Sequence, residues 1–398
     1  MPIVGEARPE AVSMKGVSQH FSSRTAWDLT ESGFAEAIRQ AKSDGQKLID
    51  LTVSNPTACG FQYDAATFLS PLNDTRALVY DPDPRGMVSA REAVAGYYAD
   101  HEATISPDAI VLTTSTSEGY SYLFRLLCNP GDEILVAQPS YPLFDFLADL
   151  DDVRLRPYPL FYDHGWWIDF AELESRIGPW TRAIVLVHPN NPTGHGTTAG
   201  DRRQLEEICV QHGLALIVDE VFLDYPLHGT KLESFAKGPH LVPTFVLSGV
   251  SKIAGLPQMK VGWIATFGPE VDRGNALARL EVIADTFLSL NLPVQFALPT
   301  WLSERAGIQN QILTRIRLND SLITTCGLER LRGEAGWSAV IRLPKIGIRA
   351  EDLLTREGVV VHPGEFYGMA EIERIVVSLI TPIDRFSEGI NRVVSVSR

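Results

Sequence analysis

The sequence contains few cysteines and no histidine arrangement that is typical of a metal site. Its four cysteines are widely spaced and form no CxxC pair: Cys59, Cys128, Cys209 and Cys326. Neither a zinc site nor a disulfide framework is therefore indicated. The nine histidines form no HExxH or HxH motif, and we predict no metal site.

The sequence also lacks an excess of positive charge, a long apolar run and a targeting segment. Its 49 acidic and 35 basic residues give a formal net charge of -14, which argues against binding the phosphates of nucleic acid. No apolar run approaches the roughly 20 residues that span a bilayer. Residues 1–21 have no basic start followed by an apolar core, so no signal peptide is expected. We expect a cytoplasmic protein with small-molecule substrates and neither nucleic acid nor membrane as a partner.

What the sequence does contain is a regular alternation of apolar strands and amphipathic helices. Several strands are continuous β-branched runs, which are typical of strands buried on both faces. Such alternation predicts a mainly parallel sheet flanked by helices. The predicted strands are 109–113, 133–138, 183–188, 214–219, 244–248 and 261–267, and the predicted helices lie near 89–100, 117–128, 142–150 and 200–212.

The pattern changes after about residue 295, where helical stretches over 295–332 precede short strands near 338–343 and 374–380 and a final helix near 383–395. We predict an α/β fold with a large domain and a smaller α/β domain, and we expect part of the N-terminal segment to share the sheet of the smaller one. The predicted parts are an N-terminal segment at 1–52, the large domain at 53–294 and the C-terminal small domain at 295–398.

The segment LSGVSKIAGLPQMKVGW, residues 247–263, holds one lysine, Lys252, in an apolar, glycine-rich setting. Burial favours a neutral amine, and a neutral amine attacks carbonyl carbons to form a Schiff base. This chemistry suggests an enzyme that uses pyridoxal phosphate (PLP). The alternative is a capping serine followed by an ordinary surface lysine.

Two polar residues follow the ends of other predicted strands, where open α/β sheets place their ligands. Asp219 ends an apolar strand in IVDEVF, and a buried carboxylate needs a cationic partner such as a protonated pyridine nitrogen. Asn191 lies in VHPNNPTG, whose prolines block a helix and hold the amide above the sheet. The alternatives are a helix N-cap for Asp219 and a plain turn for Asn191.

Three further segments are candidates for cofactor contacts. TTSTSE, residues 113–118, stands between a strand and a helix, where hydroxyl and backbone N–H groups can bind phosphate. Tyr141 in QPSYPL can stack on a flat ring, and prolines in VYDPDPRG fix a loop that carries Tyr80. The alternatives are a helix cap, a partly buried tyrosine and a surface turn.

In their order and spacing, these segments resemble the PLP-dependent enzymes of fold type I, in the class I/II aminotransferase superfamily. The resemblance extends from about Leu51 to Ser378, and NNPTG, VDEVF and SKIAGLPQMKVGW together carry it. It implies the PLP-dependent transferase fold and an aminotransferase (EC 2.6.1.-) with a ping-pong mechanism. It also implies a homodimer with shared active sites.

The resemblance implies a role for each candidate. Lys252 would form the Schiff base, and Asp219 would pair with the pyridine nitrogen. Asn191 would bond the phenolic oxygen, and Tyr141 would stack on the ring. The phosphate would be bound by Ser115, Thr116, Ser248, Ser251 and Lys260, and by Tyr80 of the neighbouring subunit, while Arg374 and Ser54 would contact the substrate carboxylate.

The sequence departs from the family pattern at several of these positions. Phe222 stands where a tyrosine usually donates to the phenolic oxygen, and Tyr225 is one turn further along. Lys260 replaces an arginine, which keeps the charge but loses the two-pronged geometry. Gly249 stands where a serine is usual. A different strand register would place Val376, two residues from Arg374, at the arginine position, and both lie on the same strand face.

Two other functions remain open from the sequence. A C–S β-lyase or related elimination enzyme could use the same fold, and an inactive binding or regulatory homologue could have kept it. The amino donor and acceptor are not predicted.

Overall fold

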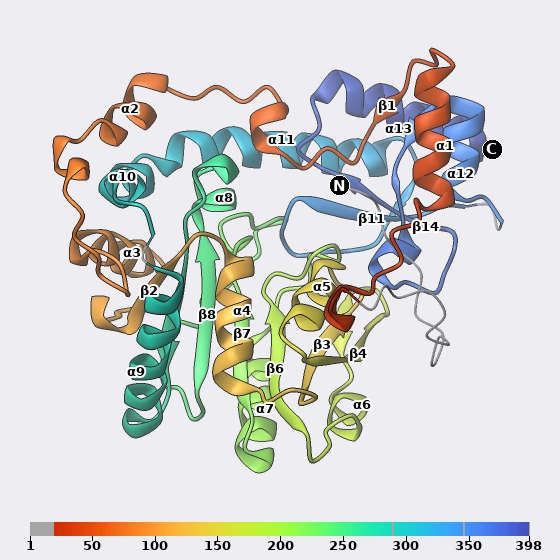
Figure 1. The fold of residues 1–398 in the computed structure, drawn as a ribbon. Coiled ribbons are helices and arrows are strands. Elements are labelled where there is room, and N and C mark those ends of the chain that lie inside the picture. Colours follow the sequence, from red (N-terminus) through yellow and green to blue (C-terminus); the bar gives the residue numbers. More distant parts are fainter. Residues whose placement is uncertain (1–19, 289, 345–346, 398) are drawn as a thin grey trace.

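The computed structural model describes residues 20–288, 290–344 and 347–397, and its central feature is an eight-stranded sheet (Figure 1). The strands lie in the order β2-β9-β8-β7-β6-β3-β4-β5. Their bounds are β2 (Ile110–Thr113), β9 (Gly262–Phe267), β8 (Thr244–Gly249), β7 (Ala215–Asp219), β6 (Thr181–Val187), β3 (Glu133–Gln138), β4 (Arg154–Tyr162) and β5 (Trp166–Ile168).

The large sheet is mainly parallel, as the sequence predicts. The neighbours from β8 through β7, β6 and β3 to β4 are parallel, whereas β9 runs antiparallel to both β8 and β2, and β5 runs antiparallel to β4. β2, β7, β8 and β9 are buried at every residue. Their apolar composition follows from helices that cover both faces.

Two layers of helices enclose this sheet. Alternate strand residues point to opposite faces, so Leu112 and Val246 pack in one hydrophobic cluster while Val111 and Leu247 pack in another. In Figure 1 the helix α4 lies in front of β7 and β8. The first cluster takes side chains from α3 (Val88–Asp100), α7 (Ala199–His212) and α10 (Leu292–Ser303), and the second from α4 (Thr116–Leu127), α5 (Leu143–Leu150) and α9 (Glu270–Phe287).

A four-stranded antiparallel sheet forms the second unit, in the order β10-β11-β14-β13. Its residues Ile341 and Ile375 point into a core of their own, whereas Val340 and Val376 belong to a cluster shared with the large sheet. One face of β11 and β14 therefore looks toward the large sheet. The elements here are α11 (Arg305–Thr325), β10 (Glu329–Arg330), β11 (Ser338–Arg342), α12 (Ala350–Glu357), β13 (His362–Pro363), β14 (Arg374–Ser378) and α13 (Ile383–Ser397).

The N-terminal part of the chain joins the second unit through a short strand. β1 (Ile49–Asp50) pairs in parallel with β12 (Val359–Val360) as a two-stranded sheet that is separate from the four-stranded one. Part of the N-terminal segment thus shares a sheet with residues of the second unit, although its partner is β12 and not one of the strands expected near 338–343 and 374–380. The carbonyl of Leu51 nevertheless accepts a hydrogen bond from the N–H of Ser378, at the end of β14. The domain boundaries at 52 and 294 remain predictions.

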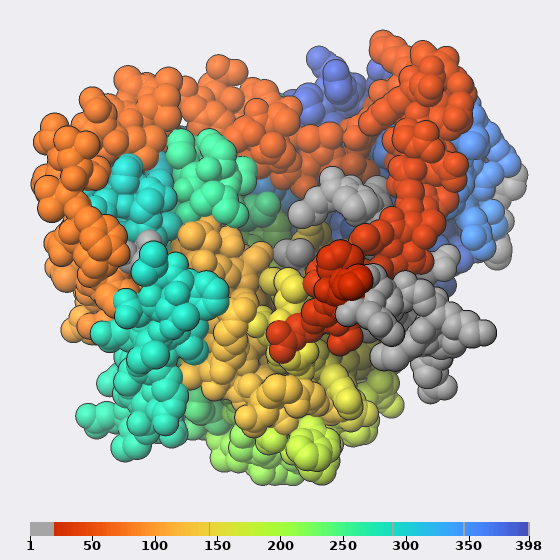
Figure 2. Space-filling view, in the orientation of Figure 1, coloured from red at the N-terminus to blue at the C-terminus, as the bar shows by residue number. Residues whose placement is uncertain are grey.

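The segment between α1 (Gly33–Ser43) and α3 runs over the surface. Figure 2 shows it in red and orange along the upper edge of the molecule, with the short helix α2 (Ala65–Leu69) on its way. None of the helices in the described part of the chain is both long and apolar enough to cross a membrane.

Candidate active site

The ends of five strands bring most of the predicted site residues to one edge of the large sheet. Val187, Asp219 and Leu247 are direct neighbours on β6, β7 and β8. Gly249 at the end of β8 faces Gly262, which in turn faces Thr113. Because neighbouring strands are about 4.8 Å apart, the residues that follow these ends form a short row across the sheet.

Lys252 lies at this edge on a single helical turn, α8 (Val250–Ile253), directly after β8. Burial lowers the pKa of Lys252 to about 8, and the negative charge of Asp219 opposes this shift. An amine with this pKa is neutral in a far larger fraction of molecules near neutral pH than an ordinary lysine with its pKa of 10.5, so it can act as a nucleophile.

Asp219 ends β7, and it is almost fully buried. Burial raises the pKa of Asp219 to about 6, while hydrogen bonds from the Val221 N–H and the Tyr120 hydroxyl, both 3.1 Å, and the charge of Lys252 oppose the rise. The carboxylate is therefore mostly ionised at pH 7. A buried negative charge of this kind suits a cationic ligand group.

Aromatic side chains surround the amine of Lys252. Its Nζ lies 5.0 Å from the ring centroid of Trp337 and 5.7 Å from that of Phe222. The hydroxyl of Tyr225 is not directed at the Lys252 amine, because it donates to the backbone carbonyl of Lys252 at 2.5 Å. The structure thus offers no donor from Phe222 or Tyr225 for a ligand oxygen.

Asn191 lies just beyond β6 in a tight turn, where the Gly194 N–H donates to the carbonyl of Asn190. Its Oδ1 accepts a hydrogen bond of 3.2 Å from the hydroxyl of Ser338, at the start of β11. With Oδ1 occupied, the Nδ2 donors of Asn191 are left for another partner.

The start of α4 supplies hydroxyl and N–H donors at the other end of the row. The Ser115 side chain caps this helix by accepting from the Glu118 N–H at 3.1 Å, and its own hydroxyl proton is still available. The helix has no acceptors of its own for its first N–H groups, including that of Thr116. A Cβ at Gly262 would lie 3.0 Å from the Thr116 nitrogen, so this glycine lets the helix start approach β9.

The other predicted phosphate contacts differ in exposure. Ser248 is fully buried, and its hydroxyl has no partner among the described residues. Ser251 is half-buried on α8, whereas Lys260 is exposed in a left-handed conformation with φ 54°. Since buried polar groups are almost always hydrogen-bonded, the Ser248 hydroxyl is a candidate for binding a ligand or water.

Tyr141 follows β3, and its side chain is 42% exposed. The neighbouring Ser140 N–H donates to the carbonyl of Tyr367, and the Gln138 side chain donates to that of Gly368. The loop that carries Tyr141 is therefore held against residues 362–369 of the second unit.

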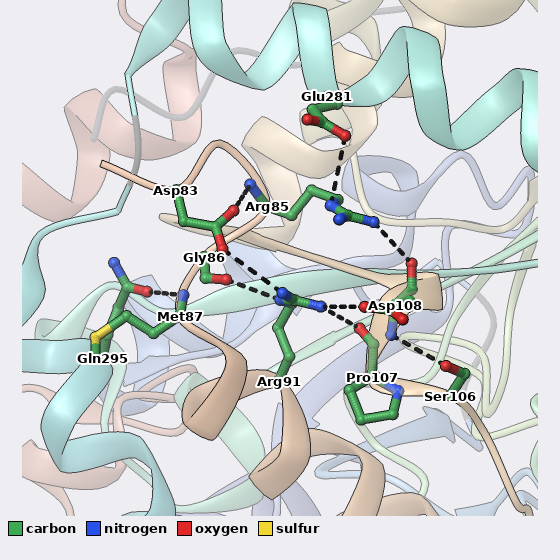
Figure 3. Close-up of polar contacts among 10 residues, drawn as sticks. All are labelled: Asp83, Arg85, Gly86, Met87, Arg91, Ser106, Pro107, Asp108, Glu281 and Gln295. Atoms are coloured by element: carbon green, nitrogen blue, oxygen red, sulfur yellow. Dashed lines mark hydrogen bonds and ion pairs between the residues drawn. The ribbon is translucent and has the colours of Figure 1, made fainter. Parts of the chain in front are cut away.

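Tyr80 is 74% exposed, and no hydrogen bond or ring contact is recorded between it and the described residues of the row in its own chain. A network beneath its loop is centred on the buried Arg91 (Figure 3). The Arg91 guanidinium donates to the carbonyl of Gly86 at 2.8 Å and to that of Pro107 at 2.9 Å, and it pairs with Asp108 at 3.1 Å. The loop is thus fixed at its end while Tyr80 remains outside.

Arg374 begins β14, and its guanidinium is engaged away from Asn191. It pairs with Glu371 at 2.7 Å and lies 5.7 Å from the centroid of the Trp166 ring. Ser378 is four residues further along the strand, or about 13 Å, and it faces Ser338, which contacts Asn191. Val376 lies between them and is buried.

Ser54, the other predicted carboxylate contact, is exposed between β1 and the next turn of the chain. The arrangement thus brings Lys252, Asp219, Asn191, Ser115, Thr116 and Ser248 to one edge of the sheet, with Ser251 beside them. Four predicted residues have no recorded contact with Lys252 or Asp219 in the described part of the chain: Tyr80, Lys260, Ser54 and Arg374.

Sequence reasoning missed two residues of the site. Tyr120 donates to Asp219 from the first turns of α4, and Ser338 donates to Asn191 from β11. Tyr120 lies four residues after Thr116, so the helical repeat of α4 could have placed both on one face. Nothing local marks Ser338, because its partner is 147 residues away.

The donors of this edge fit a flat, anionic cofactor with a basic ring nitrogen. Hydroxyl and N–H donors lie near β2 and β8, a buried carboxylate ends β7, and an amide donor follows β6. In that order they match the phosphate, the pyridine nitrogen and the phenolic oxygen of PLP.

A model of the family described as aminotransferase class I and II matches residues 46–384 of the chain. The chain belongs to this family. It is a PLP-dependent aminotransferase, which transfers the amino group of an amino acid to a 2-oxo acid. The predicted family, fold class, cofactor and type of reaction are therefore confirmed.

Curated relatives and solved structures agree with this assignment. The aminotransferase is 25% identical over 385 residues to glutamate-pyruvate aminotransferase AlaA of Haemophilus influenzae. This match covers 92% of this chain and 94% of the relative. It is 28% identical over 294 residues to AlaA of Escherichia coli, and this match covers 73% of this chain and 72% of the relative. Its fold is similar to that of alanine aminotransferase from Pyrococcus furiosus, with a TM-score of 0.83 and 21% identity over 92% of this chain and 95% of that chain.

Proposed function

We propose that Lys252 is the catalytic lysine of this aminotransferase. The observation that carries the proposal is an amine whose pKa is about 8, directly after β8, which feels the negative charge of the buried Asp219 at the end of β7. These two groups are the nucleophile and the counter-charge that the chemistry requires.

PLP, when bound, links covalently to a lysine amine and draws electrons from the α-carbon of the substrate. Lys252 holds its amine neutral in part of the molecules, so it can form this link and later accept and return a proton at the substrate α-carbon. Asp219 holds a negative charge that would keep the pyridine nitrogen protonated.

The remaining donors orient the cofactor. The Asn191 amide would donate to the phenolic oxygen, and Tyr141 would lie against the ring. Ser115, Thr116, Ser248 and Ser251 would bind the phosphate, and Lys260 would add positive charge. The free N–H groups at the start of α4 support this part of the proposal.

For the substrates, we propose glutamate as amino donor and pyruvate as acceptor. This rests on the names of the relatives, glutamate-pyruvate aminotransferase AlaA from two organisms. Arg374 and Ser54 are the proposed contacts for a substrate carboxylate. The guanidinium would have to exchange Glu371 for the substrate.

A screen of amino donors and 2-oxo acid acceptors on the purified holoenzyme tests these substrates. Glutamate should convert the cofactor to its amine form, read by absorbance, and pyruvate should reverse the change. No change with glutamate would contradict the donor, and release of pyruvate and ammonia from cystathionine without an acceptor would favour the C–S lyase.

The attachment of the cofactor is tested separately. Borohydride reduction followed by digestion should yield one labelled peptide that contains Lys252. Lys252→Ala should lose that peptide and fall in activity by several orders of magnitude, whereas Lys260→Ala, a matched change of a nearby lysine, should keep the label. A label on any other lysine would contradict the proposed site.

We further propose that the protein acts in the cytoplasm as a homodimer with shared sites, in which Tyr80 reaches the phosphate of the neighbouring subunit. Its 74% exposure and the Arg91 network that holds its loop support this role. Hybrid dimers made by mixing Lys252→Ala with Tyr80→Phe should regain activity, because one of their two sites is intact. No gain on mixing variants that exchange subunits would contradict shared sites.

A further inference from the structure

A residue of the second unit contacts the cofactor edge of the large sheet. The hydroxyl of Ser338, the first residue of β11, donates to Asn191 Oδ1 at 3.2 Å. Both side chains are half-buried. This hydrogen bond joins a residue of the four-stranded sheet to the residue that follows β6.

The bond lies within a rigid frame. The Glu334 and Ala335 N–H groups donate to the carbonyl of Gly194, at 2.7 and 3.1 Å. A Cβ at Gly194 would lie 2.5 Å from the carbonyl oxygen of Ala335, and one at Gly333 would lie 2.4 Å from that of Thr193. The turn that carries Asn191 and the segment before Ser338 are thus packed backbone against backbone.

The same segment is fixed from its other side. The Gly336 N–H donates to the carbonyl of Tyr225 at 2.9 Å, and the Leu227 N–H donates to that of Glu334 at 2.7 Å. Trp337, next to Ser338, lies against the amine of Lys252. Ser338 therefore has little freedom to move away from Asn191.

The side chain of Asn191 is more important for the phenolic oxygen in this chain, because two neighbouring residues offer that oxygen no donor. Phe222 carries no hydroxyl, and the Tyr225 hydroxyl is taken by the carbonyl of Lys252. Under the proposed function, the Asn191 amide is then the donor that remains for the phenolic oxygen. An amide can present either end to a ligand, and only its nitrogen end donates.

We propose that Ser338 is a positioning residue, whose hydroxyl holds Asn191 Oδ1 so that the Nδ2 donor faces the phenolic oxygen of the cofactor. Donation to Oδ1 also polarises the amide and strengthens its N–H donor. The inference rests on the proposed function, because it assumes the cofactor orientation given there.

The test is a spectral pH titration of the reconstituted holoenzyme. Ser338→Ala should move the pH midpoint of the cofactor's visible absorption upward by about half to one unit, because loss of about 1 kcal/mol from one hydrogen bond has this size. Ser338→Thr, which keeps a hydroxyl, should restore the wild-type midpoint. The Ser338→Ala change removes no charge, so Lys252, Asp219 and Glu334 act equally on both proteins.

Two controls separate positioning from a general effect on the strand. Ser378→Ala removes a buried hydroxyl directly opposite Ser338, one that has no partner among the described residues, and it should leave the midpoint unchanged. In an Asn191→Ala background, Ser338→Ala should cause no further shift, since the effect passes through Asn191.

An unchanged midpoint in Ser338→Ala would overturn the inference, as would an equal shift in Ser378→Ala or in the Asn191→Ala background. A wild-type protein that takes up PLP without a visible band would overturn the proposed function and this inference with it. A yellow wild type with an unshifted Ser338→Ala would overturn the inference alone.

Discussion

The hydroxyl of Tyr225 donates a hydrogen bond of 2.5 Å to the backbone carbonyl of Lys252. Tyr225 is fully buried, and its ring packs edge-on against Trp337 with 5.1 Å between the centroids. The segment after β7 is thereby tied to the helical turn that carries the lysine, so the position of the amine depends on a residue that does not touch it.

We expect Tyr225→Phe to lower the free energy of unfolding by about 1 kcal/mol, the usual net worth of one hydrogen bond, and to lower kcat because Lys252 is held less firmly. Denaturant unfolding and steady-state kinetics measure the two effects. Tyr63→Phe is the matched control, because the Tyr63 hydroxyl donates to the carbonyl of Gly255 at 2.7 Å, three residues after Lys252. An equal fall in kcat in both variants would contradict a specific effect on the lysine.

The absence of a hydroxyl at Phe222 should be visible in the cofactor spectrum. With one donor fewer, the phenolic oxygen is less stabilised as an anion, so the wild-type pH midpoint should lie above that of relatives with a tyrosine at this position. Phe222→Tyr should lower it by about one unit. Phe222→Leu controls for loss of the ring, and an ordinary low midpoint in the wild type would count against this reading.

The pKa of Lys252 predicts how cofactor uptake depends on pH. Only the neutral amine attacks the aldehyde, so the rate at which the apoprotein takes up PLP should rise as the pH rises through about 8 and level off above it. Because the charge of Asp219 raises the pKa of Lys252, Asp219→Asn should move this midpoint to lower pH. Stopped-flow absorbance measures the rate. A rate that stays flat through this range, or an upward move in Asp219→Asn, would contradict the assignment.

Arg374 offers a test of the substrate contact. If its guanidinium binds a substrate carboxylate, Arg374→Ala should raise KM for the amino donor about tenfold or more, and Arg374→Lys should rescue it only in part, since lysine lacks the two-pronged geometry. Glu371→Gln should lower KM, because it frees the guanidinium from its 2.7 Å partner. Steady-state kinetics with each donor measure this. Lost stability with an unchanged KM would leave Arg374 as a structural partner of Glu371 and Trp166.

The sequence was most informative where strands are buried on both faces. The runs that became β7 and β8 are continuous and apolar, and the polar residues after them mark the ligand edge, which is why Asp219 and Lys252 could be found. The direction of β9 could not be found in the same way, because a fully buried strand has the same composition whether it runs parallel or antiparallel.

Contacts between distant segments were beyond the sequence. Ser338 looks like any strand residue, and only the packing of Gly194 against residues 333–335 brings it to Asn191. β4 contains two prolines, and only Tyr158 and Leu160 in it are buried, so it lacks the pattern of a central strand. The short β1 has no pattern at all, and its pairing with β12 follows from the fold of the whole chain.

The row of strand ends has a consequence for the order of events during biosynthesis. Its members extend from Thr113 to Gly262, and Ser338 joins them from still further along the chain. A nascent polypeptide that has emerged only as far as β7 has the carboxylate but neither the amine nor the start of β9. We therefore expect the cofactor to bind only after synthesis has passed Gly262, because the complete row of strand ends does not exist before that point.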